Sequence, residues 1–471
     1  MLIIKKRAFA LYHYIIMKRN IDMTTGSPFK KIMAFSLPVA ISFLLQNTYR
    51  LGDTLIVSLS RGENAVTGIN LTGSLSFLVL GFAQGCSAGF GIVLSQYVGA
   101  KNEQKMKQSL ATSLLLSLIV GSVLTVFTLI FARSILELMQ TNELFIEYSV
   151  SYVQAIFTGI IFNVLYNLGD QVMRAMGDSK TPLFILILCA ILNLSLNSLL
   201  FITDLPSSWA GWATIISQGI SAIVSFIVIF KKYPVLRLNK SHFKLNAKFA
   251  FKHLRVGLPM SFQFMLTALG CMIQQSAFNS LPNPDYAMAQ STGSKIDNLC
   301  SSILVGSANS IAIYCGQNYG AKQIDKIMPG LKAGLVMGLI YSTISYALSI
   351  FLCKPLGRLL LQGANESVYG YIFQYLSIQS LFYYVLFILL SYRQALQGLG
   401  RSSITVLGGF AELVMRWLVA ELLAKNFGFD GAIYSNVLAW IAGAICFVIA
   451  THVVVGKLKR KQKQNQAVFV E

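Results

Sequence analysis

The segment SQYVGAKNEQKMKQSL (residues 95–110) returns as GQNYGAKQIDKIMPGL (residues 316–331), 221 positions further along the chain. Other positions repeat at nearly the same offset: Pro38 pairs with Pro259 at 221, Gly177 with Gly400 at 223 and Gly211 with Gly431 at 220. Self-similarity at a fixed spacing indicates a duplicated structural unit. The sequence therefore predicts two related halves within its 471 residues.

The composition of the chain is that of a polytopic membrane protein. Apolar residues make up 55% of it and charged residues only 12%, about half the charged fraction of a soluble domain. One helix needs about 20 apolar residues to cross a bilayer. Twelve runs are long enough: they lie near 32–57, 67–94, 109–132, 146–170, 182–203, 209–230, 254–279, 287–315, 331–353, 370–391, 402–424 and 431–455. A soluble enzyme, a nucleic-acid binder and a disordered regulator are therefore excluded.

Lys and Arg residues are distributed unevenly between the two sides of these spans. If the N-terminus is cytoplasmic, 30 of them lie on the cytoplasmic side and 5 on the other side. Cytoplasmic loops of membrane proteins are enriched in Lys and Arg, so we expect both termini in the cytoplasm. The net charge of +20 then reflects orientation and contact with anionic membrane lipid, with no nucleic-acid partner.

Six spans in each half give both halves the same orientation. Parallel repeats of this kind occur in transporters that move two lobes around a central site; the alternative is that duplication only builds a large bundle. The expected parts are a cytoplasmic N-terminal segment (1–29), an N-lobe with helices 1–6 (30–232), a basic cytoplasmic linker (233–251), a C-lobe with helices 7–12 (252–456) and a basic cytoplasmic tail (457–471). The sequence leaves open whether translation starts at Met1 or Met23.

The seven cysteines and four histidines form no metal or redox motif. No two cysteines have zinc-site or dithiol spacing, and the histidines lie in loops or at the end of a span. The chain also lacks the GxxxxGK[ST] loop that binds ATP phosphates. We therefore expect no enzyme, no bound metal and no cofactor, and a membrane ion gradient as the source of energy.

Several motifs together resemble the multidrug and toxic-compound extrusion (MATE) family, in its DinF-like branch. They are TTGSPFKKIMAFSLP (24–38), LGDTLIVSLSRGENAVTGI (51–69), LSQYVGAKN (94–102), RAMGDSKTP (174–182), LNLSLN (192–197) and CGQNYGAK (315–322).

The resemblance implies an all-α protein with twelve transmembrane helices in two six-helix bundles that form a V. It also implies a bacterial cytoplasmic membrane and antiport of organic, often cationic and amphipathic, compounds against H⁺ or Na⁺. The alternative is a lipid-linked saccharide flippase of a related superfamily, which should have a more cationic cavity.

The N-terminal half contains the candidate residues for cation coupling. An ionisable residue within a span costs about 2.5–3.5 kcal/mol, so it is a functional candidate. Asp53 lies one helical turn after Arg50, and the two could form a structural ion pair. The resemblance instead implies that Asp53 couples the ion, assisted by Asn193, Asn197 and Asn167. The family usually has Asp at the position of Asn197, and an amide exchanges no proton near neutral pH.

The C-terminal half offers weaker candidates. Glu412 and Arg416, four residues apart, are expected to form a structural pair, with a second cation site as the alternative. Lys295 and Asp297 are also expected to pair, and Asp170 in the first half is expected to be a helix-cap or loop charge.

A multidrug site should be aromatic and adaptable, with a few polar groups. The candidates for such a substrate wall are Gln263, Gln274, Tyr375, Gln379 and Tyr383, although aromatic residues are also ordinary in membrane helices. Pro38 and Pro259 are candidate helix hinges or simple kinks. We expect a monomer with a small-molecule substrate.

Overall fold

The computed structural model describes residues 20–467 apart from 140, 245 and 362. The expectations for residues 1–19 fall outside this part of the chain. The described residues form α-helices and four short 3₁₀ helices, and no strand is found among them.

The N-terminal half contains eight α-helices. They are α2 (Pro28–Arg61), α3 (Glu63–Leu71), α4 (Gly73–Gly99), α5 (Glu103–Leu138), α6 (Glu143–Thr158), α7 (Ile160–Ala175), α8 (Lys180–Asn197) and α9 (Trp209–Lys232). The 3₁₀ helix η1 (Ser198–Phe201) follows α8, and η2 (Pro234–Leu236) and η3 (Lys240–Phe243) lie in the linker.

The C-terminal half repeats this order. Its helices are α10 (Ala247–Asn279), α11 (Pro284–Gly320), α12 (Ile327–Leu360), α13 (Glu366–Leu381), α14 (Tyr383–Gly398) and α15 (Ser402–Ala467), with η4 (Ile324–Lys326) before α12. The lobe limits expected from the sequence stay predictions, and α10 begins five residues before the expected start of the C-lobe.

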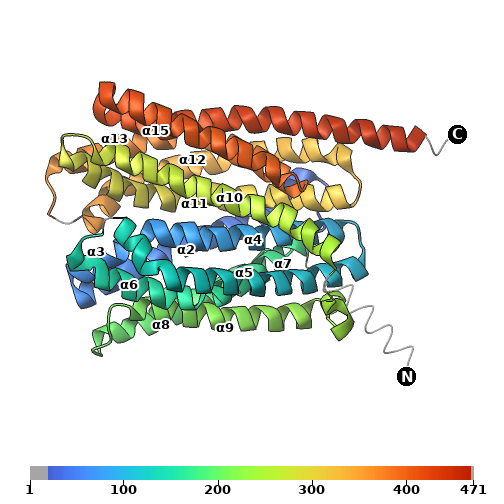
Figure 1. Ribbon diagram of the computed structural model, residues 1–471. Helices are drawn as coiled ribbons and strands as arrows, with labels where there is room; N and C mark the ends of the chain where they lie inside the picture. The colour runs from blue at the N-terminus through green and yellow to red at the C-terminus, as the bar shows by residue number, and fades with distance from the viewer. Residues whose placement is uncertain (1–19, 140, 245, 362, 468–471) are drawn as a thin grey trace.

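The described helices account for twelve spans. Nine are long and apolar enough to cross a membrane by themselves, and two further spans are broken helices: α6 with α7, bent by 51°, and α13 with α14, bent by 48°. The twelfth comes from α15, which is two helices joined at Gly428, where φ is +58°. Figure 1 shows α15 turning back on itself at this point.

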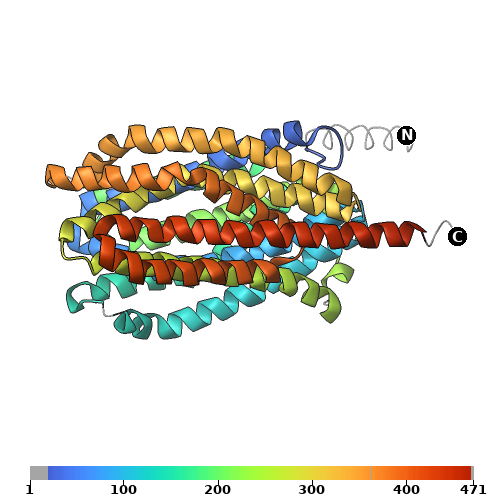
Figure 2. The same ribbon diagram turned by 90° about the horizontal axis from the view of Figure 1, so that it is seen from above.

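The two halves form two helical bundles that lie side by side. In Figure 1 the N-terminal bundle (blue to green) lies below the C-terminal bundle (yellow to red). The first and last described residues lie at the same end of the molecule in both views (Figures 1 and 2), as an even number of spans requires. We call this the termini end and the opposite one the far end.

Both sequence-predicted hinge prolines lie inside continuous helices. Pro38 is within α2 and Pro259 within α10. The two broken spans instead bend around Gly159 and Phe382, which are 223 residues apart. The duplication is thus reproduced in the broken spans, at positions that the apolar pattern alone does not mark.

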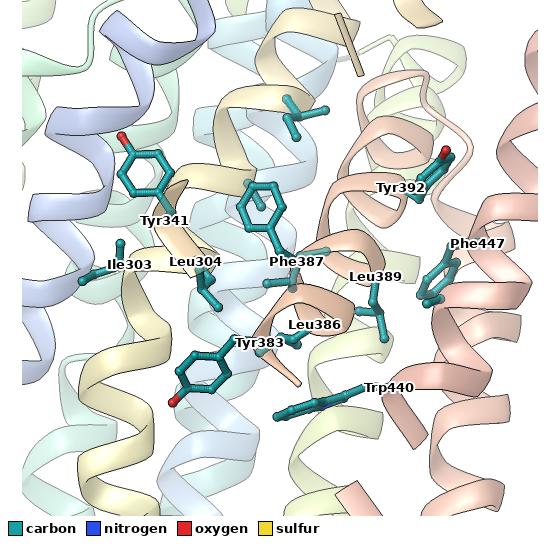
Figure 3. Packing of buried hydrophobic residues seen from close by; sticks show 14 of the residues in the cluster. Ile303, Leu304, Tyr341, Tyr383, Leu386, Phe387, Leu389, Tyr392, Trp440 and Phe447 are labelled. Atoms are coloured by element: carbon teal, nitrogen blue, oxygen red, sulfur yellow. The ribbon is translucent and has the colours of Figure 1, made fainter. Parts of the chain in front are cut away.

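The interior of the C-terminal bundle is filled by large side chains. Figure 3 shows Tyr383 and Phe387 of α14 between α11 and the second half of α15, which contributes Trp440 and Phe447. Phe387 packs directly on Gly338 of α12, where a Cβ would overlap its ring. Within lipid, where apolar surface has no water to escape, such close packing is a main source of helix association.

The bundles contact each other mainly through α4 with α10 and α2 with α11. Near the termini end, a Cβ on Gly99 of α4 would overlap the carbonyl oxygen of Gln317, and a Cβ on Gly320 of α11 would overlap that of Gln96. These two glycines occupy equivalent positions of the repeat. The turn after each of them is made by the following lysine, because Lys101 and Lys322 have φ of 51° and 60°.

The same two glutamines link the bundles by hydrogen bonds. Gln96 Nε2 donates to the carbonyl oxygen of Gly398 at 3.1 Å, and Gln317 Nε2 donates to that of Ala175 at 2.9 Å. Gly398 and Ala175 are 223 residues apart, so these two contacts are also related by the repeat. Gln317 Oε1 additionally accepts the backbone N–H of Met23 at 3.1 Å. We call this set of contacts the paired glutamine contact.

The turn between α7 and α8 is fixed by the buried carboxylate of Asp178. Its oxygens accept from the backbone N–H groups of Lys180 and Thr181, from Lys232 Nζ and from the Tyr233 hydroxyl. Burial alone would raise the pKa of Asp178, but the hydrogen bonds from Lys232, Thr181 and Tyr233 outweigh it and lower the pKa below its usual value. This carboxylate therefore ties the beginning of the linker to α8.

We expect Gly99→Ala to destabilise the protein, because the added methyl group must displace the α11 backbone. Overpacking of this kind costs about 1–3 kcal/mol, so the thermal unfolding midpoint in detergent should fall. The matched control is Gly370→Ala on α13, where a Cβ would meet open space, and its midpoint should not fall. Equal midpoints for the two variants would show that the close approach of α4 and α11 does not stabilise this structure.

Asp178→Asn should reduce stability at neutral pH, by about 2 kcal/mol, since hydrogen bonds to charged groups contribute about 1.5–3 kcal/mol. The folded-state pKa is lowered, so the carboxylate stabilises the fold above its unfolded pKa of about 3.9, and this contribution is lost as the pH falls through the folded pKa. The midpoints of wild type and variant should therefore converge as the pH is lowered from about 7 to about 3. A difference that stays constant over this range contradicts the assignment.

Candidate functional site

A cavity of about 300 Å³ lies in the N-terminal bundle. We call it the α2 cavity. Residues of α2, α3, α4, α6, α7 and α9 line it, and those of α4 lie between Gly73 and Gln84. The next turns of α4 are covered by the other bundle, where Gly85 and Gly89 meet the α10 backbone. The cavity thus adjoins the region where α4 contacts α10, and a Cβ on Gly81 of its wall would contact Phe264 of α10.

Asp53 lies on the wall of this cavity and is partly buried. Asn197 Nδ2 donates to Asp53 Oδ1 at 2.8 Å. The side-chain amide of Asn193 forms hydrogen bonds with both of its neighbours when its nitrogen faces Asp53. In this orientation Asn193 Nδ2 donates to Asp53 Oδ1 at 2.5 Å, and Asn193 Oδ1 accepts from the Thr214 hydroxyl at 3.2 Å. Two buried amide donors therefore converge on one carboxylate.

Arg50 lines the same cavity but forms no ion pair with Asp53. The two are three residues apart on α2, and their charged groups are not within 4 Å of each other. The structural ion pair considered from the sequence is therefore not formed. Arg50 remains exposed on the cavity wall.

Asn167 is not brought directly to Asp53. Its Nδ2 donates to the backbone oxygen of Asn163 at 2.8 Å and to the Asn163 side-chain oxygen at 3.0 Å. Asn163 Nδ2 in turn donates to Gln218 Oε1 at 3.1 Å, and both of these residues line the α2 cavity. Asn167 thus orients a cavity residue. Asn163, one turn earlier on α7, could have been found from the same helical spacing.

Asp170 was expected from the sequence to be a helix-cap or loop charge. It instead belongs to an ion pair inside α7. Its Oδ2 lies 2.9 Å from Arg174 Nε, and the Arg174 side chain is only 6% exposed. The Arg174 guanidinium also lies over the ring of Phe43, 5.6 Å from its centre. These contacts pair the two charges within a helical bundle, although Arg174 Nη1 has no hydrogen-bond partner among the described residues.

Glu412 and Arg416 do not form the expected structural pair. Arg416 NH2 donates instead to Asn436 Oδ1 at 2.6 Å, and Asn436 donates to Gln379, which donates to the Tyr375 hydroxyl. Glu412 is buried, and its Oε1 has no hydrogen-bond partner among the described residues. Helical spacing brought the two side chains to one face, but Asn436 on the second half of α15 is the better-placed acceptor.

The expected pair of Lys295 and Asp297 is also wrong. Residues two apart on a helix do not face each other, and Asp297 Oδ1 instead accepts from the Tyr383 hydroxyl at 2.8 Å. Another charged residue of this bundle, Arg393, lies inside α14. The C-terminal bundle therefore contains several charged groups that belong to internal networks.

The five candidate substrate-wall residues are buried within the C-terminal bundle in this conformation. Tyr375, Gln379 and Tyr383 are at most 1% exposed, and Gln263 and Gln274 are at most 5% exposed. Their contact with a substrate stays a prediction. Among the described residues, no three His, Cys, Asp or Glu side chains are grouped so as to hold a metal ion.

Comparisons with known proteins agree with this architecture. The MatE family model matches residues 38–199 and again residues 259–421, once in each bundle. A probable multidrug resistance protein, YoeA of Bacillus subtilis, is 27% identical over 348 residues, covering 70% of this chain and 74% of that protein. A FAD transporter of Shewanella oneidensis is 23% identical over 430 residues, covering 90% of this chain and 94% of that one.

Solved structures share the whole fold. An outward-facing conformation of a multidrug resistance MATE family transporter superposes with a TM-score of 0.88 at 19% identity, covering 94% of this chain and 99% of that chain. A transporter of the MOP superfamily from Pyrococcus furiosus gives 0.87 at 19% identity with the same coverage. The chain has the twelve-helix fold of these structures, and the family model matches it once in each bundle. It therefore belongs to the MatE family of multidrug and toxic-compound extrusion (MATE) membrane transporters.

Proposed function

We propose that the protein exports small organic, often cationic and amphipathic, compounds by antiport with H⁺ or Na⁺, through alternating access. One observation carries this proposal. Asp53 is a carboxylate on the wall of a cavity within a membrane-spanning bundle, held by the amides of Asn193 and Asn197. Inserting an ionisable residue into a membrane costs free energy, so its presence within a span indicates a function.

Asp53 is suited to take up and release a cation. Its two amide donors stabilise the ionised form without supplying a positive charge, so the carboxylate remains available to a proton or a sodium ion. The ionisable groups that share the cavity with it are Tyr49, Arg50 and Tyr152. Each charge that moves across 100 mV supplies about 2.3 kcal/mol, which is the energy available for export.

The two-bundle arrangement supports alternating access. The paired glutamine contact joins the bundles at the termini end, and the α2 cavity lies further from that end, along residues 73–84 of α4. With both termini in the cytoplasm of a bacterial cell, this conformation would present the cavity to the outside. The inward-facing conformation would require the paired glutamine contact to break.

The names of the relatives indicate a general class of substrate. Two groups of relatives are named for multidrug resistance or export, and another is named a FAD transporter. These names have in common that the molecules moved are small organic compounds. We assign the same general class to this protein, which would act as a monomer surrounded by lipid.

Asp53→Asn should abolish gradient-driven export while the protein still inserts, because an amide cannot exchange a proton near neutral pH. The measurement is efflux of a fluorescent dye from proteoliposomes under a pH gradient and, separately, a sodium gradient. The matched control is Asp204→Asn, which removes an exposed carboxylate after η1 and should leave efflux unchanged. Wild-type efflux by the Asp53 variant would rule out the coupling role.

Asn197→Asp should keep export under at least one of the two gradients. It places a second carboxylate 2.8 Å from Asp53, so the two groups would share one proton or cation, as closely spaced carboxylates do. The resemblance implies that the family usually has Asp at this position. Initial efflux rates of variant and wild type, compared at several pH values, test this. A correctly inserted but inactive variant would mean that Asn197 must remain neutral in this protein.

A further inference from the structure

Among the side chains that the structure describes, Arg50 and Asp53 are the two charged residues that line the α2 cavity. Asp53 receives hydrogen bonds from Asn197 and Asn193. By contrast, no carboxylate among the described side chains lies within 4 Å of the Arg50 guanidinium. The cavity wall therefore carries a positive group and a negative group that are not neutralised by each other.

Two opposite charges held apart on one wall are complementary to a molecule that carries both. Residues three apart on a helix have Cβ atoms about 5–6 Å from each other, and here the charged ends are more than 4 Å apart. A guanidinium presents a planar fork of N–H donors that fits a carboxylate or a phosphate. A substrate with only a cationic group would find a partner in Asp53 but would be repelled by Arg50.

We infer that Arg50 determines substrate specificity by binding an acidic group, so that the protein selects zwitterionic amphiphiles over molecules that carry only a positive charge. The inference rests on the proposed export function and adds the substrate class. The cationic part of the substrate meets Asp53, and the acidic part meets Arg50.

The rest of the α2 cavity fits the uncharged part of such a molecule. Its wall includes the aromatic side chains of Tyr49, Phe77 and Tyr152, and its volume of about 300 Å³ suits one small aromatic ring system. The amides of Asn163 and Gln218, already hydrogen-bonded to each other, form another part of the wall. An aromatic body between two charged ends matches these surfaces.

This arrangement is compatible with exchange against a cation. The coupling ion and the cationic end of the substrate compete for Asp53, so occupation by one favours release of the other. Arg50 keeps its charge at all physiological pH values. Its contribution to selection therefore does not vary during the cycle.

The test compares two dyes with one aromatic body. Rhodamine 110 carries a free carboxylate beside its cationic ring system, whereas in rhodamine 123 a methyl ester masks the carboxylate and leaves only the positive charge. Binding to purified wild-type protein in detergent is measured by fluorescence anisotropy. Rhodamine 110 should bind about tenfold more tightly than rhodamine 123, a difference of about 1.4 kcal/mol.

Arg50→Gln should remove this difference, because rhodamine 110 loses about tenfold in affinity while rhodamine 123 binds at least as well as before. Retained binding of rhodamine 123 also reports that the variant has folded. The matched control is Arg133→Gln, which changes a surface guanidinium on α5 and should leave both affinities unchanged. Arg50→Lys should recover part of the preference.

Equal affinity of the two dyes for wild type, no binding of rhodamine 110, or an equal loss for both dyes in Arg50→Gln overturns the inference. The binding assay uses no gradient, so it is independent of the coupling mechanism. If the dye preference holds but neither dye is moved by a gradient in proteoliposomes, the proposed export function fails and the role of Arg50 in recognition stands.

Discussion

The absence of water inside a bilayer is the constraint on which this structure depends. A backbone N–H or C=O in hydrocarbon must find a partner within the chain, and the described spans are accordingly all helices. The same constraint acts on side chains. Buried serines and threonines such as Ser217 and Thr128 donate back to carbonyls of their own helix, and the amides of Asn163 and Gln218 pair with each other. Among the described residues, sixteen buried side-chain nitrogen and oxygen atoms have no hydrogen-bond partner, and three of these belong to the charged groups of Arg174, Glu412 and Arg416.

The sequence was sufficient to predict the class of fold, the duplication and the span positions, because hydropathy and repetition are properties of long segments. It was also sufficient to bring Asp53, Asn193 and Asn197 into one hypothesis, since their helical spacing and the family motifs agree. The pairings within the C-terminal half were not predictable in the same way. Helical spacing placed Glu412 beside Arg416, but it carries no information about Asn436, which reaches Arg416 from a different helix. The breaks at Gly159 and Phe382 likewise interrupt runs that remain apolar throughout.

The two bundles share one arrangement of helices but differ in their buried polar and charged residues. At an offset of 221, Asp53 corresponds to Gln274, and at 223, Asn193 corresponds to Arg416. The N-terminal bundle keeps a carboxylate, two amide donors and a cavity, whereas the C-terminal bundle has an arginine and a chain of buried hydrogen bonds through Asn436, Gln379 and Tyr375. Large aromatic side chains such as Phe387, Trp440 and Phe447 fill the interior of the C-terminal bundle (Figure 3). Duplication supplied the frame, and the carboxylate with its two amide donors lies in the N-terminal copy.

The paired glutamine contact is made of two copies of one interaction, Gln96 with Gly398 and Gln317 with Ala175, around the interlocked Gly99 and Gly320. Gly99 packs on the backbone of Gln317, and Gly320 packs on the backbone of Gln96. Separating one copy of the contact therefore displaces the other copy. In the alternating-access cycle proposed above, a half-open form would leave one buried amide without its partner while the other copy of the contact stayed in place. The repeat would therefore favour breaking or forming both copies together, so that this end of the molecule would open and close in one step.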